Sequence, residues 1–150
     1  MEIIGGGRVF VYPDADERPH EPGAEENWQE SFVLIWMDLE QKVGGFFRLG
    51  HEPNWQGGRA QFMSNIFSPE GVYHRSTHLP LRPEDRRADG FGNGEDTLSY
   101  SYDGAIRWSL NDKDVSAELL VNNFVPSIDA HKREGQADAH DYTRNHVDAA

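Results

Sequence analysis

The stretch that decides the fold runs from residue 27 to residue 54 and reads NWQESFVLIWMDLEQKVGGFFRLGHEPN. Residues 28–37 are mostly aromatic, β-branched or long and apolar, and so are residues 45–49, with the polar turn DLEQKVG between the two runs. Apolar runs of this length joined by a short polar turn are typical of a β-hairpin. The stretch therefore predicts two antiparallel strands.

The rest of the chain continues this pattern. Further strands are predicted at residues 8–12, 59–67, 71–79, 97–103, 105–111 and 115–125. Ser68-Pro69-Glu70-Gly71 predicts a turn because proline presets the backbone at its second position, and Asp103-Gly104 is a strong hairpin signal. No convincing buried helix interrupts these strands. The sequence predicts an antiparallel all-β domain, closed as a barrel or a curved sandwich.

Changes in composition divide the chain into three parts. Residues 1–27 are predicted to hold an N-terminal strand and an acidic loop, residues 28–125 the β-barrel domain, and residues 126–150 a polar tail or linker. Within the barrel domain, proline, glycine and charge replace any apolar pattern over residues 80–96. That length is unusual for a hairpin turn and predicts a mobile surface loop or a lid.

Composition excludes several classes of function. The 150 residues suit one domain, and the absence of cysteine removes thiol nucleophiles, thiolate zinc sites and disulfides. The formal net charge of −12 opposes binding to nucleic acid or to an anionic membrane surface, which both require clustered Lys and Arg. No secretion signal or long apolar span is visible, so a cytoplasmic location is expected.

Alternation in the first strand raises the question of a ligand site. Even positions from 28 to 36 carry Trp, Glu, Phe, Leu and Trp, but the odd positions also include Val, Ile and Met, which predicts a strand covered on both sides. If the hairpin pairing centres on residue 41, Phe46 and Arg48 share the face of Glu30. These charged residues then line a ligand cavity, or they face water on an ordinary hairpin.

Histidine offers a second candidate site. His74 and His78 are four residues apart on a predicted strand and share a face, and with His51 they could form a facial metal set. The alternative is that the seven histidines of a polar chain occupy its surface. No helix-borne HExxH motif is present, and we predict no metal site.

Several motifs resemble a known family. They are N-W-x-E-S at residues 27–31, G-G-F-x-R-x-G at 44–50 and the Pro-Asn pair at 53–54, followed by SPEG, LSYSYDG and ELLVNNFVPSIDAH. Together they resemble the N-terminal half of the hydroxyneurosporene synthase (carotenoid hydratase) and AttH-like superfamily over nearly the whole chain. The resemblance implies a lipocalin-like barrel, commonly two in a chain more than twice this length. The missing half is then a removed segment, a separate chain or a second copy.

The resemblance also implies hydration, cyclisation or isomerisation of an apolar isoprenoid-like or polyketide-like molecule, without a cofactor. Such chemistry requires an apolar cavity, aromatic walls that favour a developing cation, and an acid that donates a proton. The predicted catalytic residues are Glu30, as proton donor, and Arg48, which orients it or the polar end of the ligand. The predicted ligand-binding residues are Trp28, Phe32, Trp36, Phe46, Asn54, Trp55 and His74.

Two functions from other classes remain open. The domain could be a lipocalin-like carrier that binds a small molecule without chemistry. It could also be a subunit of a larger assembly, with the apolar outer face of its first hairpin strand packed on a partner. That partner would be a second barrel domain, a separate subunit or the other copy of a homodimer.

Overall fold

The computed structural model describes residues 11–12, 17–92, 95, 97–122, 127–128 and 148–149, and it confirms the all-β prediction. Its strands are β1 (Val11–Tyr12), β2 (Glu30–Asp38), β3 (Val43–Glu52), β4 (Arg59–Ser68), β5 (Gly71–Pro80), β6 (Arg86–Arg87), β7 (Gly90–Phe91), β8 (Leu98–Tyr102), β9 (Ile106–Asp112), β10 (Val115–Asn122), β11 (Ser127–Ile128) and β12 (Asp148–Ala149). A short 3₁₀ turn, η2 (Pro83–Asp85), precedes β6. No helix in these residues is long and apolar enough to cross a membrane.

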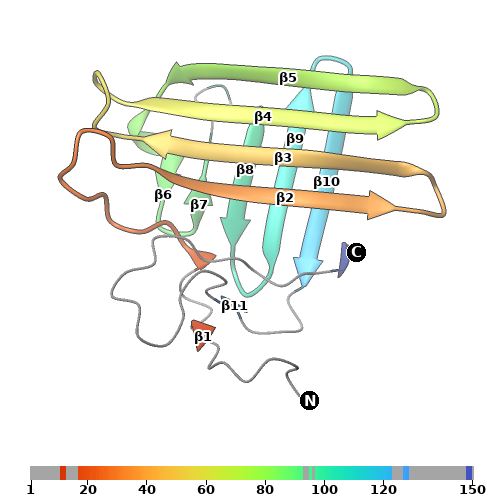
Figure 1. Ribbon diagram of the computed structural model, residues 1–150, viewed down its shortest axis with the longest axis horizontal. Helices are drawn as coiled ribbons and strands as arrows, with labels where there is room; N and C mark the ends of the chain where they lie inside the picture. Colours follow the sequence, from red (N-terminus) through yellow and green to blue (C-terminus); the bar gives the residue numbers. More distant parts are fainter. Residues whose placement is uncertain are drawn as a thin grey trace, which may run out of the picture.

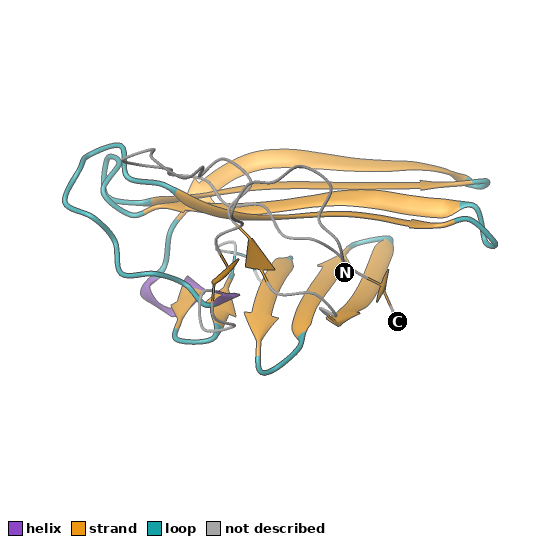
Figure 2. Cartoon of the chain, turned by 60° about the horizontal axis from the view of Figure 1, so that its bottom comes forward, coloured by secondary structure: helices purple, strands orange, loops and turns teal. Residues whose placement is uncertain are grey.

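The strands form a sandwich-like arrangement of two antiparallel sheets. One sheet has the order β2-β3-β4-β5 and the other the order β12-β10-β9-β8-β7-β6, and β1 pairs separately with β11. The long strands β2–β5 run crosswise over the strands of the second sheet (Figure 1), and the two sheets lie as separate layers (Figure 2). The described strands form no closed barrel. Of the two closures predicted, the structure therefore supports the sandwich.

The β2–β3 hairpin has a different register from the one expected. Glu30 pairs with His51 and Asp38 with Val43, which places the centre of the hairpin between residues 40 and 41. The Asp38 carboxylate fixes the turn by accepting hydrogen bonds from the backbone and side-chain N–H groups of Gln41, at 2.9 and 3.1 Å. Because side chains alternate along a strand, this small change exchanges the two faces of β3.

The core lies between the sheets and is rich in aromatic rings. Phe32 of β2 stacks on Tyr100 of β8, with ring centroids 4.0 Å apart, and meets Phe91 of β7 edge-on at 5.1 Å. Phe47 of β3 lies 6.0 Å from Trp108 of β9. All five rings are less than 5% exposed, so side chains occupy the space between the sheets here.

The shorter connections follow the sequence prediction. Ser68 pairs with Gly71 across the Pro69-Glu70 turn, and Gly104, with φ of 102°, allows the Asp-Gly turn between β8 and β9. The segment over residues 80–96 differs from the expected mobile loop or lid. Its continuous described part, residues 80–92, contains η2, β6 and β7, and it buries Asp85 and Phe91. The polar tail falls mostly outside the described residues.

Candidate functional site

Glu30 lies at the start of β2, where it joins three segments of the chain. Its carboxylate accepts hydrogen bonds from the backbone N–H of His20 at 3.0 Å, from His20 Nδ1 at 2.5 Å and from Arg86 Nη2 at 3.0 Å. The Glu30 side chain is 10% exposed, whereas the His20 side chain is 45% exposed. Glu30, His20 and Arg86 form what we call the Glu30 cluster, a nearly buried carboxylate beneath an accessible imidazole.

The segment before Arg86 holds it in this position. Asp85 is 1% exposed, and its carboxylate accepts hydrogen bonds from the Arg82 backbone N–H at 2.8 Å and from Arg82 Nη2 at 2.6 Å. The Asp85 carbonyl accepts a hydrogen bond from the Gly92 N–H at 2.6 Å. These bonds tie both ends of residues 82–92 together, so that Arg86 projects from a fixed backbone toward Glu30.

Aromatic rings surround the guanidinium of Arg86. Its Cζ lies 5.3 Å from the ring of Trp28 and 5.1 Å from the ring of Phe91, distances at which a cation is attracted to the face of a ring. Arg86 Nη2 also donates to the His20 carbonyl. Arg86 therefore binds both the Glu30 side chain and the segment that carries His20.

His51 of β3 lies behind the Glu30 cluster and is fully buried. Its Nε2 is 2.7 Å from the Gly92 carbonyl, and because a carbonyl only accepts, Nε2 carries the proton. Burial lowers the pKa of His51 below 6.5, against a smaller opposing effect of the Gly92 carbonyl. His51 is therefore neutral at pH 7, and its buried Nδ1 has no hydrogen-bond partner within the described part of the chain.

This burial predicts a dependence of stability on pH. Between pH 6.5 and the lower pKa of folded His51, the unfolded chain binds more protons than the folded one, so the free energy of unfolding falls as pH falls. Urea unfolding at several pH values should show this loss, and His51→Gln should remove its part of the slope. The control is His78→Gln on exposed β5. An unchanged slope in His51→Gln would contradict the expected titration.

A cleft of about 560 Å³ lies beside the Glu30 cluster. Three segments form its walls, residues 19–22, 53–58 and 81–88. The apolar part of its lining comes from Pro19, Pro22, Pro53, Leu81 and Pro83, and the polar part from His20, Glu21, Arg82, Arg86 and Arg87. The lining of the cleft is therefore part apolar and part charged, with both basic and acidic side chains.

Arg48 and Phe46 do not lie where the sequence analysis placed them. Phe47, Leu49 and His51 are the side chains of β3 that face inward with Glu30, and Arg48 pairs with exposed Val33 on the outer face. Arg86 takes the place beside Glu30 that was predicted for Arg48. The reason is the register of the hairpin, whose centre lies half a residue before the expected one.

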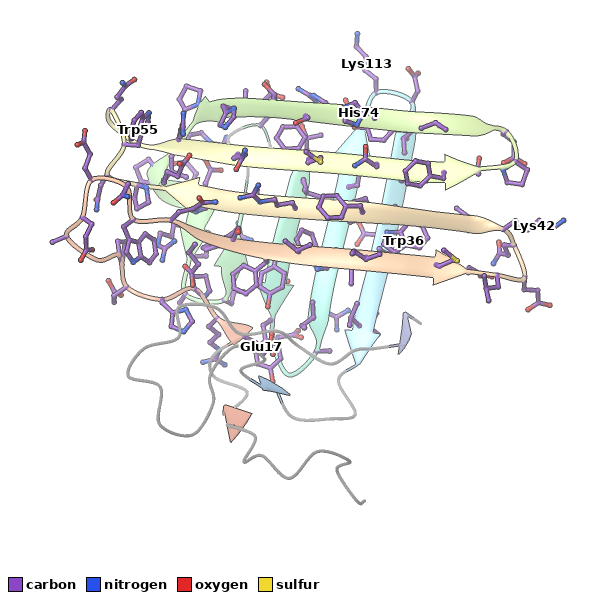
Figure 3. The ribbon with its side chains drawn as sticks, in the orientation of Figure 1. Glu17, Trp36, Lys42, Trp55, His74 and Lys113 are labelled. Carbon is purple, nitrogen blue, oxygen red and sulfur yellow. The ribbon has the colours of Figure 1, made fainter. Side chains whose placement is uncertain are left out.

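The predicted ligand-binding residues lie in several parts of the molecule. Trp28 contacts the Glu30 cluster through Arg86, whereas Phe32 is in the core and Trp36 packs at its margin. Trp55 lies in the β3–β4 turn, and His74 lies on β5 (Figure 3). Because β5 is exposed at position 74, that histidine faces outward. The structure therefore gathers only some of these residues near the cleft.

Asn54 contributes to the cleft indirectly. Its Nδ2 donates to the carbonyls of Gly23 and Glu25, both at 2.8 Å. Asn54 thus ties the segment that follows His20 to the turn after β3, and both of these segments line the cleft.

The three histidines considered as metal ligands do not converge. His51 is buried on the inner face of its sheet, whereas His74 and His78 lie at exposed positions of β5. Among the described residues, no group of three or more His, Cys, Asp or Glu side chains is placed to hold a metal ion.

Sequence reasoning missed His20 and Arg86, which belong to the cluster with Glu30. His20 stands in an acidic stretch without apolar pattern, and Arg86 stands in the segment predicted as a loop or lid. Their positions depend on contacts across 10 and 56 residues, respectively. The sequence did offer one signal for these two residues: each stands in a charge-rich, proline-containing segment, and the two segments flank the long hairpins.

A protein-family model matches most of the chain. The model of a domain of unknown function, DUF7064, matches residues 13–150. The chain belongs to this family. No curated protein and no solved structure shows significant similarity to the chain. The DUF7064 family therefore accounts for nearly the whole chain, and its description names no activity.

Proposed function

We propose that this DUF7064 domain binds a small molecule in the cleft and transfers a proton to or from it. The reaction would be a cofactor-independent hydration, cyclisation or isomerisation. The observation that carries the proposal is the contact of 2.5 Å between His20 Nδ1 and the Glu30 carboxylate at a residue lining the cleft. A carboxylate that holds one imidazole nitrogen leaves the other free for acid–base chemistry.

In this mechanism His20 is the group that exchanges the proton. Glu30 accepts a hydrogen bond from His20 Nδ1, which directs the lone pair of neutral His20 to Nε2. His20 lines the cleft and its side chain is 45% exposed, which supports a role for Nε2 toward a molecule bound there. A base at this position removes a proton from carbon beside a carbonyl group, and its protonated form returns the proton at another carbon or to a departing hydroxyl.

Glu30 is the positioning residue in this proposal. Its oxygens accept from two groups of His20 and from Arg86, which fixes the direction of the imidazole and compensates the carboxylate charge. The role differs from that of proton donor, which the sequence analysis gave to Glu30. In the competing mechanism Glu30 donates its own proton. The two mechanisms make opposite predictions for the turnover of the His20 and Glu30 variants.

The lining of the cleft favours one class of substrate. Proline rings and Leu81 provide an apolar wall, while Arg87 and the Glu30 cluster provide charge. A polyketide-like molecule with a carbonyl or carboxylate group matches this mixture better than an isoprenoid hydrocarbon, which offers no acceptor to an arginine. The resemblance to the carotenoid hydratase and AttH-like superfamily supports the same type of cofactor-independent chemistry.

The test uses His20→Asn. The asparagine amide can occupy the place of Nδ1 and donate to Glu30, but it lacks Nε2. Turnover should therefore fall ~10²-fold or more, while binding of the same compound is retained. Binding is measured by calorimetry, and turnover is followed by mass spectrometry on a panel of polyketide-like and isoprenoid compounds. His78→Asn, on exposed β5, is the matched control.

The outcomes separate the candidate functions. Unchanged turnover in His20→Asn would contradict the role of His20. If turnover is lost in Glu30→Gln but not in His20→Asn, proton donation is assigned to Glu30. Binding without turnover in the parent protein would favour the carrier. Absence of both from every compound would leave the cleft without a ligand of these classes and would overturn the proposal.

A further inference from the structure

The outer face of the β2–β5 sheet carries an unusual number of apolar side chains. Five of them, with Leu39 of the adjoining β2–β3 turn, form what we call the outer apolar patch and are between 50% and 78% exposed: Val33, Ile35, Met37, Leu39, Phe67 and Val72. Strands β2–β5 also extend past β10 at this end of the sandwich (Figures 1 and 2). Soluble monomers rarely expose a contiguous apolar surface beyond a few hundred Å², and larger patches mark interaction sites.

The two edges of this sheet differ in how they resist pairing with another strand. Within the described residues, β2 pairs only with β3 and β5 only with β4. β5 carries His74, Arg75 and His78 and ends at Pro80, and charge and proline protect an edge. β2 has nine residues in unbroken register with β3, without proline, lysine or arginine. In the part of the chain that the structure describes, the edge of β2 is therefore the one open to strand addition.

We propose that a second copy of this chain pairs with β2, joining two four-stranded sheets into one continuous sheet of eight strands. A two-fold axis makes the two β2 strands antiparallel, and centring the pairing on Ile35 sets the two Ile35 side chains side by side. Val33 then lies opposite Met37 of the partner subunit on the same outer face. A centre on Leu34 would instead oppose Glu30 and Asp38, which are both acidic.

The absence of charge along β2 and its self-complementary apolar strip favour a second copy as the occupant. The chain has a net charge of −12, so two copies repel each other through most surfaces, but residues 31–37 contain no charged side chain. A two-fold interface requires a patch that is complementary to itself, and an apolar strip along an edge strand meets that condition. Of the outer apolar patch, Val33, Ile35 and Met37 lie on β2, so pairing of the two β2 edges sets these three side chains against their counterparts in the second copy and leaves Phe67 and Val72 outside the interface.

The experiment is sedimentation of the full chain at micromolar concentration, which should give twice the monomer mass of 17.0 kDa. Ile35→Asp places a charge at the centre of the interface, and it should shift the protein to the monomer. Val72→Asp is the matched control, because Val72 is similarly exposed but lies on β5, away from the proposed pairing. Neither site is buried, so both variants should unfold at the denaturant midpoint of the parent monomer.

Hydrogen exchange gives a second readout that does not depend on a variant. Amide exchange along β2 should slow as protein concentration rises, whereas exchange along β5 should not change. A parent protein that sediments only as the monomer would overturn the proposal. Dissociation by Val72→Asp as strongly as by Ile35→Asp would overturn the edge pairing in favour of stacking through the whole outer face.

Discussion

Replacing Phe47 with alanine should lower the free energy of unfolding by about 3–5 kcal/mol. The Phe47 ring is fully buried, and its centroid lies 6.2 Å from the ring of Trp36 and 6.0 Å from that of Trp108. Truncation leaves a cavity between the two sheets, which the surrounding strands cannot fill without breaking their register. Because a domain has only about 5–15 kcal/mol of stability, this single change should remove a large part of it.

The neighbouring residue provides a control with the same chemical change. Phe46→Ala also replaces phenylalanine, but Phe46 lies on the outer face and is only partly buried. Its loss should cost about 1–2 kcal/mol, because less apolar surface is exposed and no interior cavity forms. Equilibrium urea unfolding of both variants measures the difference. A greater loss from Phe46→Ala would mean that the hairpin pairs about residue 41, as the sequence alone suggested.

This pair also shows how far the sequence determines the fold. Strand positions followed from alternation and turn chemistry, because both are local, and β4, β5 and β9 begin and end within one residue of their predicted bounds. The face of Phe46 depended on a half-residue difference in the centre of the hairpin, which the four-residue turn and the Asp38–Gln41 bonds decide. Turn geometry of this kind is weakly encoded in a polar sequence such as DLEQKVG.

The candidate site was less predictable for a related reason. Glu30 stood out because it interrupts an apolar strand, but its partners come from segments without periodic pattern. Arg86 was hidden in a stretch of proline, glycine and charge, and that stretch is organised by the burial of Asp85 and Phe91. Long-range contacts of this sort leave no regular spacing in the sequence, so the identity of the cation beside Glu30 could not be inferred.

Gly90→Ala should also destabilise the domain strongly, by about 3 kcal/mol. A Cβ at this position would lie 2.0 Å from the Tyr100 carbonyl oxygen and 2.8 Å from the Ser101 Cα, both on β8. These are backbone atoms of an inner strand, held by β9 on the other side, so they cannot move aside as a flexible side chain would. The added methyl group must therefore separate β7 from β8.

The damage should spread from β7 to the candidate site, because Phe91 and Gly92 follow directly and position Arg86 and His51. The control is Gly57→Ala, where nothing lies within 4 Å of the added Cβ but φ is +90°, so that only backbone strain of about 1–2 kcal/mol is expected. Urea unfolding measures both losses, and exchange of the Tyr102 amide, which donates to the Asp89 carbonyl at 2.7 Å, reports on β7 locally. If Gly90→Ala were as stable as the parent and kept this amide protected, β7 would not pack against β8 at this distance, and the placement of Arg86 beside Glu30 would lose its structural basis.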